Sequence, residues 1–286
     1  MKVDFFIVGA PKAGTTSLYH YLSEHPETDM SILKEPNYFS EKSIKDNYLY
    51  YKSYPIKKLS RYHSLFKNNN LIKGEASVSY LYYKDVAKSI KAYNSSARII
   101  IMLRDPIERA FSHYLMDFRL GLINDTFENI IFQKSNLSNS KTYFQQYVKL
   151  GEYTNQIKRY FNEFPSEQIL VVDYDDFKNK TSDVVKKVYK FLNIDINFSP
   201  ELNNKHNARF IVNNRLLKFL FSKIIIRKVM NLIFPKFIKS FIKNQFFNNK
   251  PPILLPSARL YLRQYFKKDI ENLSNFLQKD YSKWIK

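Results

Sequence analysis

The sequence predicts an α/β fold, a three-layer domain with a central parallel sheet flanked by helices. Short apolar runs typical of buried strands occur at residues 3–8 and 97–103, and each is followed by a segment with helical spacing. Strands that alternate with helices indicate a parallel sheet, because each returning helix covers a face of the sheet. The 286 residues, 44% of them hydrophobic, are enough to bury a sizeable core.

The elements follow from local signals in chain order. The first strand leads through a glycine-containing loop into a helix that Pro26 closes. The run at 97–103 is the strongest strand, and from its end at Arg104 a helix continues to about Leu120. The other expected elements are strands at 71–75 and 168–173 and helices at 153–163, 181–192 and 256–279.

The chain is strongly basic, with 46 Lys and Arg against 26 Asp and Glu and a formal net charge of +20. Such a balance predicts anionic partners: nucleic acid, an anionic membrane face, or acidic small molecules and glycans. The chain has no cysteine, which excludes a disulfide framework, a thiolate metal site and a cysteine nucleophile. Its five histidines are scattered without metal-ligand spacing.

We expect a single domain over residues 1–286, with a basic helical insertion at about 210–247 that Pro235 divides. Its Lys/Arg and Ile/Leu/Phe residues fit both a membrane-surface helix and a helix packed on the core. The apolar run Phe5–Val8 is too short for a signal peptide. We therefore expect a cytoplasmic bacterial protein, and peripheral contact with the inner face of the membrane through the insertion stays open.

Two of the five glycines fall in one loop between the first strand and its helix, which reads Gly9-Ala10-Pro11-Lys12-Ala13-Gly14-Thr15-Thr16. Free backbone N–H groups and the helix dipole bind phosphate at such a place. The loop is P-loop-like, but Thr15 stands where a nucleotide-triphosphate loop has its lysine, and the lysine here is Lys12. The loop predicts an anion site and argues against handling of a γ-phosphate. A plain strand–helix turn is the alternative.

A second group of residues follows the strongest strand and reads Arg-Asp-Pro-Ile-Glu-Arg-Ala-Phe-Ser from Arg104 to Ser112. The carboxyl ends of strands in open α/β sheets face the ligand crevice, which places Arg104 there. Ser112 lies eight residues later, about two turns into the expected helix. An arginine and a hydroxyl that converge there hold a second phosphate. Alternatively, Arg104 pairs with Asp105 or Glu108 at a helix N-terminus.

Together the two groups of residues resemble the motifs of a family of sulfotransferases. These enzymes use 3′-phosphoadenosine 5′-phosphosulfate (PAPS) and release 3′-phosphoadenosine 5′-phosphate (PAP). In that family a [KR]-x-G-T-[TS] loop holds the phosphosulfate and an R-[DN]-P-x-x-R-x-x-S stretch holds the 3′-phosphate. The stretch Lys34-Glu35-Pro36-Asn37-Tyr38-Phe39 is similar to a motif of heparan-type carbohydrate sulfotransferases. The resemblance also covers the segment that begins at Gly151 and the C-terminal NNKPP loop, helix and Trp284, and it is weakest at 120–150 and 210–247.

The resemblance implies roles for particular residues. It makes Glu35 the general base and Lys12 the cation that stabilises charge on the leaving phosphate oxygen. His20, His25 and His113 compete for the base role, because related families use histidine. The residues that would bind the donor are Pro11, Lys12, Ala13, Gly14, Thr15, Thr16, Ser17, Arg104 and Ser112. Tyr153 would lie by the adenine, and Lys250 would lie over the 3′-phosphate. The acceptor would contact Lys34, Ser77 and Tyr80, although the stretch around Ser77 lacks the proline of the family pattern.

These observations predict a PAPS-dependent sulfotransferase that acts on a hydroxyl, or less favourably an amine, of a carbohydrate or glycan. The mechanism requires no metal, and no specific nucleic-acid partner is expected. One alternative is a P-loop kinase or NTPase, against which the shifted lysine argues. The other is a non-enzymatic basic protein that binds a membrane surface or nucleic acid. Single-strand binders need an aromatic–basic platform, whereas the aromatic residues here are spread along the chain.

Overall fold

The computed structural model describes residues 1–47, 55–68, 70–202 and 251–286 of the chain. This part of the chain is built on a five-stranded sheet in the order β2-β3-β1-β4-β5, in which all neighbouring strands are parallel. The strands are β1 (Phe5–Gly9), β2 (Thr28–Met30), β3 (Ile72–Ala76), β4 (Arg98–Leu103) and β5 (Ile169–Asp173).

Apart from Arg98 at the start of β4, the central strands β1 and β4 are apolar, as expected for a sheet with helices on both faces. All five residues of β1 are buried, and so are the residues of β4 after Arg98. Such continuous apolar runs are typical of strands in parallel sheets. Strand β1 pairs with β3 and β4, with Phe5 opposite Gly74 and Arg98, and its register with β4 shifts between Ile7 and Gly9. The shift lies just before the loop that leads to the first helix.

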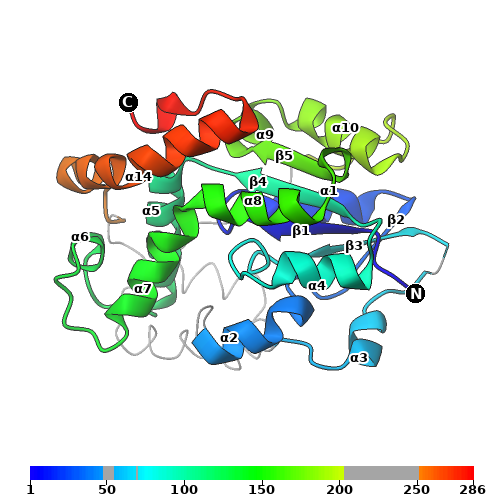
Figure 1. Ribbon diagram of the computed structural model, residues 1–286, viewed down its shortest axis with the longest axis horizontal. Coiled ribbons are helices and arrows are strands. Elements are labelled where there is room, and N and C mark those ends of the chain that lie inside the picture. The colour runs from blue at the N-terminus through cyan, green and yellow to red at the C-terminus, as the bar shows by residue number, and fades with distance from the viewer. Residues whose placement is uncertain (48–54, 69, 203–250) are drawn as a thin grey trace, which may run out of the picture.

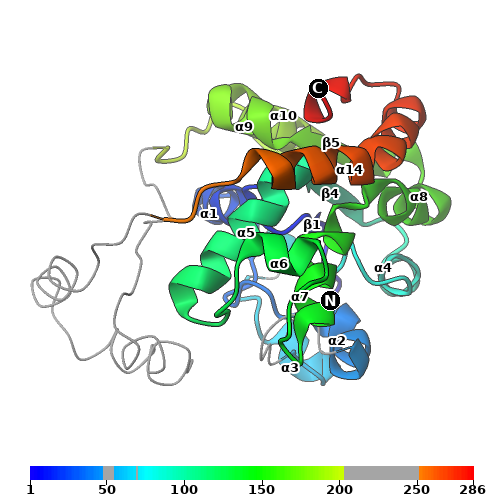
Figure 2. The ribbon, with the colours of Figure 1, turned by 90° about the vertical axis from the view of Figure 1, so that its left-hand side faces the viewer.

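Helices form the two outer layers, with α4 and α8 on one face of the sheet and α1 and α10 on the other (Figures 1 and 2). The α-helices are α1 (Thr15–Glu24), α2 (Glu41–Asn47), α3 (Leu59–His63), α4 (Val86–Tyr93), α5 (Pro106–Leu120), α6 (Phe127–Ile131), α7 (Ser140–Tyr147), α8 (Tyr153–Glu163), α9 (Tyr174–Asn179), α10 (Thr181–Leu192) and α14 (Pro256–Leu277). Short 3₁₀ turns are η1 (Tyr38–Ser40), η2 (Lys149–Gly151), η3 (Ser166–Gln168) and η4 (Ser282–Trp284).

The C-terminal helix α14 joins the layers rather than standing apart from them. It packs against α8, α5 and α6, and Figure 2 shows it running across the molecule above α5. Its buried residues belong to the same hydrophobic cluster as the strands. The carboxyl ends of the strands, to which the loops after β1, β2 and β4 connect, therefore lie against a wall formed by α5 and α14.

The expected strands and long helices are confirmed with small differences at their ends. Strand β2 was not predicted, because it has only three residues and contains Asp29. The carboxylate of Asp29 is buried and accepts the amides of Lys67 and Asn68, each at 2.8 Å. The helices α2, α3, α4, α6, α7 and α9 were also missed. The basic segment at 210–247 lies outside the described residues.

Candidate active site

The first predicted anion site lies in the loop between β1 and α1. Gly14 stands before α1 with a left-handed φ of 89°, and no side chain caps the helix there. A Cβ at this position would lie 3.1 Å from the ring of Phe177. In the described ranges, the amides of Gly14, Thr15 and Thr16 donate no hydrogen bond to a protein acceptor. Open N–H groups at the positive end of a helix form a site for a phosphate.

Lys12 extends from this loop toward α5. Its backbone has a left-handed φ of 69°, which costs a residue other than glycine about 1 kcal/mol. Its Nζ lies 3.4 Å from the Sδ atom of Met116. Burial lowers the pKa of Lys12 to about 8, and the Asp117 carboxylate opposes this effect. An anion bound beside such a lysine restores its charge, so the environment suits an anionic ligand.

Arg104, at the end of β4, connects the second predicted anion site with the first. Its Nη1 donates to the Lys12 carbonyl oxygen at 3.0 Å. Its guanidinium group lies over the ring of Tyr174, 4.7 Å from the centroid, and Tyr174 directly follows β5. The cation–π contact and the hydrogen bond hold the guanidinium between the ends of three neighbouring strands.

Helix α5 begins directly after Arg104 and carries further polar residues. The Asp105 carboxylate caps it by accepting the Ile107 amide at 2.8 Å, as expected for a helix N-cap. Ser112 lies in the second turn and is partly buried. Further along, Asp117 is fully buried and accepts the Tyr147 hydroxyl at 2.6 Å.

Glu35 lies in the loop that follows β2. Its backbone has a left-handed φ of 63°, and its amide donates to the Ala76 carbonyl oxygen at 2.9 Å. Its carboxylate forms an ion pair with Lys34 at 2.6 Å. About a third of the Glu35 side chain, 35%, is exposed, so the carboxylate is accessible to a ligand.

These groups converge at the carboxyl edge of the sheet. Asp117 and Glu35 raise the pKa of Lys12, whereas Arg104 and Arg119 lower it, so all four charges act on the same ammonium group. Arg119 comes from the last turn of α5. Arg104 and Arg119 thus bring two further cations near Lys12, and the partly exposed Glu35 carboxylate lies near the same ammonium group. This arrangement suits a ligand with several negative charges and a neighbouring group that gives up a proton.

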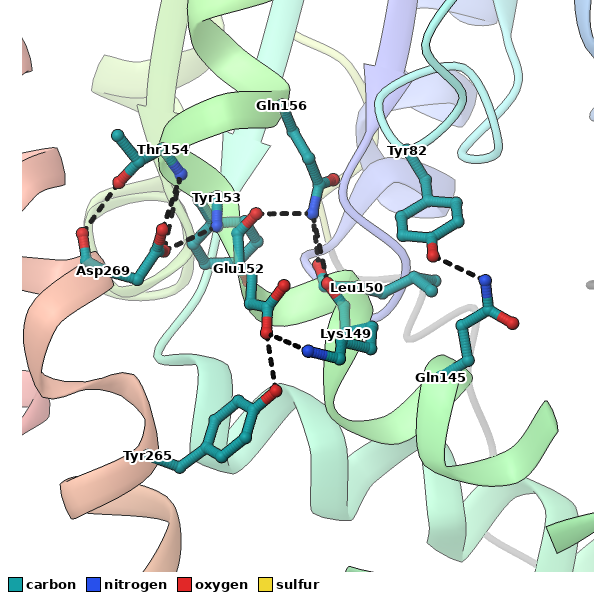
Figure 3. Close-up of polar contacts among 10 residues, drawn as sticks. All are labelled: Tyr82, Gln145, Lys149, Leu150, Glu152, Tyr153, Thr154, Gln156, Tyr265 and Asp269. Carbon is teal, nitrogen blue, oxygen red and sulfur yellow. Dashed lines mark hydrogen bonds and ion pairs between the residues drawn. The ribbon is translucent and has the colours of Figure 1, made fainter. Parts of the chain in front are cut away.

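The backbone of Arg104 is held from behind by α8 and α14. The Tyr153 hydroxyl donates to the Arg104 carbonyl oxygen at 2.8 Å. The Asp269 carboxylate accepts the amide of Tyr153 at 2.7 Å and that of Thr154 at 3.3 Å (Figure 3). The Thr154 hydroxyl donates to the Asp269 carbonyl oxygen at 2.7 Å. Asp269 therefore caps α8 and fixes the residue that supports Arg104.

A second set of contacts lies beside this cap (Figure 3). The Glu152 carboxylate accepts the Tyr265 hydroxyl at 2.6 Å and pairs with Lys149 at 2.8 Å. The Gln156 side-chain amide donates to the Glu152 carbonyl oxygen at 2.7 Å. These bonds join η2, α8 and α14 into one hydrogen-bonded unit behind Arg104.

Three predicted ligand contacts have a different place in the structure. Ser77 and Tyr80, expected to contact the acceptor, have no exposed surface and form hydrogen bonds to the segment that carries Glu35. Tyr153, expected beside the adenine, is fully buried and supports Arg104 through its hydroxyl. In each case the side chain is buried and forms a hydrogen bond to the backbone of another segment.

The candidate histidines differ in their surroundings. His25 is buried between the rings of Tyr189 and Phe198, and its Nε2 lies 2.9 Å from the Asp195 carbonyl oxygen. Burial holds the pKa of His113 well below its usual range, so it stays neutral at neutral pH. His20 lies on α1 against the ring of Tyr19. His25 and His113 thus have buried surroundings, whereas the carboxylate of Glu35 is partly exposed.

Other sequence predictions concern the remaining surface. Lys250 lies outside the described residues. Within the described ranges no group of three or more His, Asp or Glu side chains is placed to hold a metal ion. The helices in these ranges include none that is long and apolar enough to span a membrane.

Sequence reasoning assigned no role to Glu75 or Asp117, two fully buried carboxylates near the site. Glu75 lies within a short buried strand, where an acidic residue is unusual. Asp117 lies five residues after Ser112 on α5, beyond the end of the recognised motif. An acid among apolar neighbours was the available signal in both cases.

Comparison with known proteins agrees with this geometry. Residues 2–231 match the model of the sulfotransferase domain family. The chain is 27% identical over 245 residues to human carbohydrate sulfotransferase 15, a match covering 66% of this chain and 43% of that protein. It is 27% identical over 195 residues to the bifunctional heparan sulfate N-deacetylase/N-sulfotransferase 1 of Caenorhabditis elegans, covering 67% and 22%. The chain spans less than half the length of these curated relatives.

Solved structures show the same fold. The crystal structure of a sulfotransferase from Alicyclobacillus acidocaldarius superposes with a TM-score of 0.72 at 25% identity, and the match covers all of both chains. The mouse sulfotransferase SULT7A1 complexed with PAP superposes with a TM-score of 0.52 at 17% identity, over 97% of this chain and 89% of that one. The family match spans most of the chain, and this chain belongs to the sulfotransferase family.

Proposed function

We propose that this protein transfers a sulfuryl group from PAPS to a hydroxyl group of a carbohydrate. The observation that carries the proposal is the hydrogen bond between Arg104 and the Lys12 carbonyl oxygen, which joins two cationic sites at the carboxyl edge of the sheet. A donor with a 5′-phosphosulfate and a 3′-phosphate needs two such sites at a fixed separation.

Each site fits one end of the donor. The open amides at the start of α1, together with Lys12, suit the 5′-phosphosulfate. Arg104, together with the Ser112 hydroxyl, suits the 3′-phosphate, because guanidinium groups bind phosphate in a bidentate manner. The likeness in fold to a sulfotransferase complexed with PAP supports this donor.

The residues of this chain account for the transfer step. The Glu35 carboxylate accepts the proton of the acceptor hydroxyl as its oxygen attacks sulfur, and the bond between sulfur and the bridging 5′-phosphate oxygen breaks. The ammonium group of Lys12 stabilises the negative charge that develops on that leaving oxygen. The Glu35 carboxylate raises the pKa of Lys12, which supports a place for both groups near one reaction centre.

The acceptor class is supported by the relatives and by the surface around Glu35. The curated relatives include carbohydrate and heparan sulfate sulfotransferases. Lys34 and Arg119 flank the site with positive charge, which suits an acidic glycan. The shifted lysine and the family match both disfavour a P-loop kinase, and the family match also disfavours a basic scaffold without activity.

Transfer of ³⁵S from labelled PAPS tests the function directly. The acceptors are desulfated heparan, heparosan and chondroitin, with neutral dextran for comparison. We expect label on at least one acidic glycan and a loss of about 10²-fold or more in Glu35→Gln, the usual contribution of a general base. Glu41→Gln, which changes a partly exposed carboxylate on α2, is the matched control. Full activity of Glu35→Gln would remove Glu35 from the mechanism, and no label on any carbohydrate would refute the acceptor class.

A further inference from the structure

Glu75 is a carboxylate buried at the carboxyl end of β3, with no exposed surface. Three hydroxyl groups donate to it: Ser77 at 2.5 Å, Tyr62 at 2.5 Å and Tyr80 at 3.1 Å. No Lys or Arg in the described ranges forms an ion pair with it. A buried carboxylate without a cation is costly, so its retention calls for a purpose beyond packing.

Two of the three hydroxyls connect Glu75 with the segment that follows Glu35. The Asn37 amide donates to the Ser77 hydroxyl oxygen at 3.0 Å. The Phe39 amide donates to the Tyr80 hydroxyl oxygen at 3.2 Å. A hydroxyl has one proton to donate, and here the carboxylate accepts it. The lone pairs of both oxygens are therefore turned toward the two amides.

Further bonds attach the same segment to the end of β3. The Glu35 amide donates to the Ala76 carbonyl oxygen at 2.9 Å. The Ser79 hydroxyl donates to Oδ1 of the Asn37 side chain at 2.6 Å, and Nδ2 of the same side chain donates to the Glu35 carbonyl oxygen at 2.8 Å. Glu35 and Asn37 both have left-handed backbones, which need such support in residues other than glycine.

We propose that the ionised Glu75 carboxylate is a positioning residue, which orients the Ser77 and Tyr80 hydroxyls so that they hold the catalytic loop around Glu35. The proposal rests on the function assigned above to Glu35. Glu75 touches neither donor nor acceptor, because no part of it is exposed. A protonated Glu75 carries a donor of its own and would turn one hydroxyl away from the loop.

The titration of this network depends on few groups. Burial raises the pKa of Glu75 to about 7, and Glu35 adds to that shift. The other ionisable groups that interact with Glu75 are the phenols of Tyr62, Tyr80, Tyr93 and Tyr160, each with a pKa raised above its usual value. The phenols stay protonated at neutral pH, so Glu75 is the member of the buried cluster that titrates there. Loop order is then expected to fall on the acid side of neutrality.

Hydrogen–deuterium exchange of the peptide containing residues 35–39 tests the proposal without requiring activity. The variants are Glu75→Gln, Ser77→Ala and, as the control, Tyr62→Phe, all measured at pH 8.5. Tyr62 donates to Glu75 but bonds to no amide of the loop, and a phenylalanine keeps its stacking on Tyr38. In Glu75→Gln and Ser77→Ala we expect about tenfold faster exchange in this peptide, as befits the loss of one or two buried hydrogen bonds.

Matched measurements separate positioning from general damage. Exchange in the peptide covering residues 10–18 and the affinity for PAP are expected to stay within about twofold of wild type in both variants. The kcat for sulfuryl transfer is expected to fall about tenfold or more in both, with Tyr62→Phe near wild type. The proposal is overturned if residues 35–39 of Glu75→Gln and Ser77→Ala exchange at the wild-type rate. It is also overturned if exchange accelerates equally in the two peptides. Absence of transfer by the wild-type protein would refute the proposed function instead, and the exchange result would still decide the role of Glu75.

Discussion

The lowered pKa of Lys12 predicts that the protein takes up a proton when it binds PAP under alkaline conditions. In the free protein, burial lowers this pKa to about 8, so at pH 9 roughly nine molecules in ten carry a neutral lysine. A phosphate beside the amine favours the charged form, and the pKa in the complex rises toward or above its usual value. Binding at pH 9 therefore requires a proton from solution.

The size of the effect follows from linkage. Uptake is expected to be about 0.5 proton at pH 8 and about 0.9 at pH 9. The affinity for PAP is expected to fall roughly tenfold between pH 7 and pH 9, and to keep falling until the pH reaches the pKa of Lys12 in the complex. Phosphate monoesters lose their second proton near pH 6, so the ligand itself contributes little above pH 8. His113 stays neutral throughout, because burial holds its pKa well below the usual range.

Calorimetric titration of PAP in two buffers with different enthalpies of ionisation measures the uptake directly. Lys12→Met is expected to abolish it and to weaken binding at pH 7 by about 10- to 100-fold, as for loss of a charge-assisted hydrogen bond. Lys88→Met, which changes an exposed lysine on α4, is the matched control and is expected to behave as wild type. Uptake near zero at pH 9, or uptake that persists in Lys12→Met, would refute the assignment of Lys12 to the donor site.

Three further predictions concern the residues that shape the site. Gly14→Ala places a Cβ against the Phe177 ring at a left-handed φ, so PAP binding is expected to weaken at least tenfold by calorimetry, with far-ultraviolet circular dichroism unchanged. Asp269→Ala removes the cap of α8 and is expected to lower the free energy of unfolding by about 1 kcal/mol in urea titrations. The control Glu271→Ala changes an exposed neighbour and is expected to have little effect. Equal losses in the two variants would contradict the capping role. The folded-state pKa of Glu75 is raised from 4.5 to about 7, so the folded protein holds this proton more tightly than the unfolded chain does. The stability that this proton contributes is complete below pH 4.5 and is lost as pH rises through 7. The free energy of unfolding of wild type is therefore expected to fall by roughly 3 kcal/mol relative to that of Glu75→Gln between pH 4.5 and pH 8.5. A difference between the two proteins that does not depend on pH would contradict the raised pKa.

The sheet and the donor loop could be predicted because their signals are local. Continuous apolar runs such as β4 identify buried strands from residue type alone. The loop around Gly14 carries its own signature, since glycine, lysine and hydroxyl residues at fixed spacing follow a strand. The motif that begins at Arg104 was located in the same way, and the structure joins it to Lys12 through one hydrogen bond.

The supporting residues could not be assigned in this way, because their roles depend on contacts between distant segments. Ser77 and Tyr80 were interpreted as acceptor contacts, and only the folded chain shows that both are buried under the Glu35 loop. Asp269 caps a helix that begins 116 residues earlier. Asp117 was missed because its effect on Lys12 arises from the approach of α5 to the loop after β1. Spacing within one segment carries no record of such pairings.

The identity of the donor decides what this site does, and titration with PAP and with magnesium-ATP tests it most directly. Wild-type protein is expected to bind PAP in the micromolar range and magnesium-ATP much more weakly. Arg104→Ala is expected to lose PAP binding, whereas Arg98→Ala, at the opposite end of the same strand, is expected to retain it. Absence of PAP binding, tighter binding of magnesium-ATP, or full PAP affinity in Arg104→Ala would contradict the assignment of this site to PAPS.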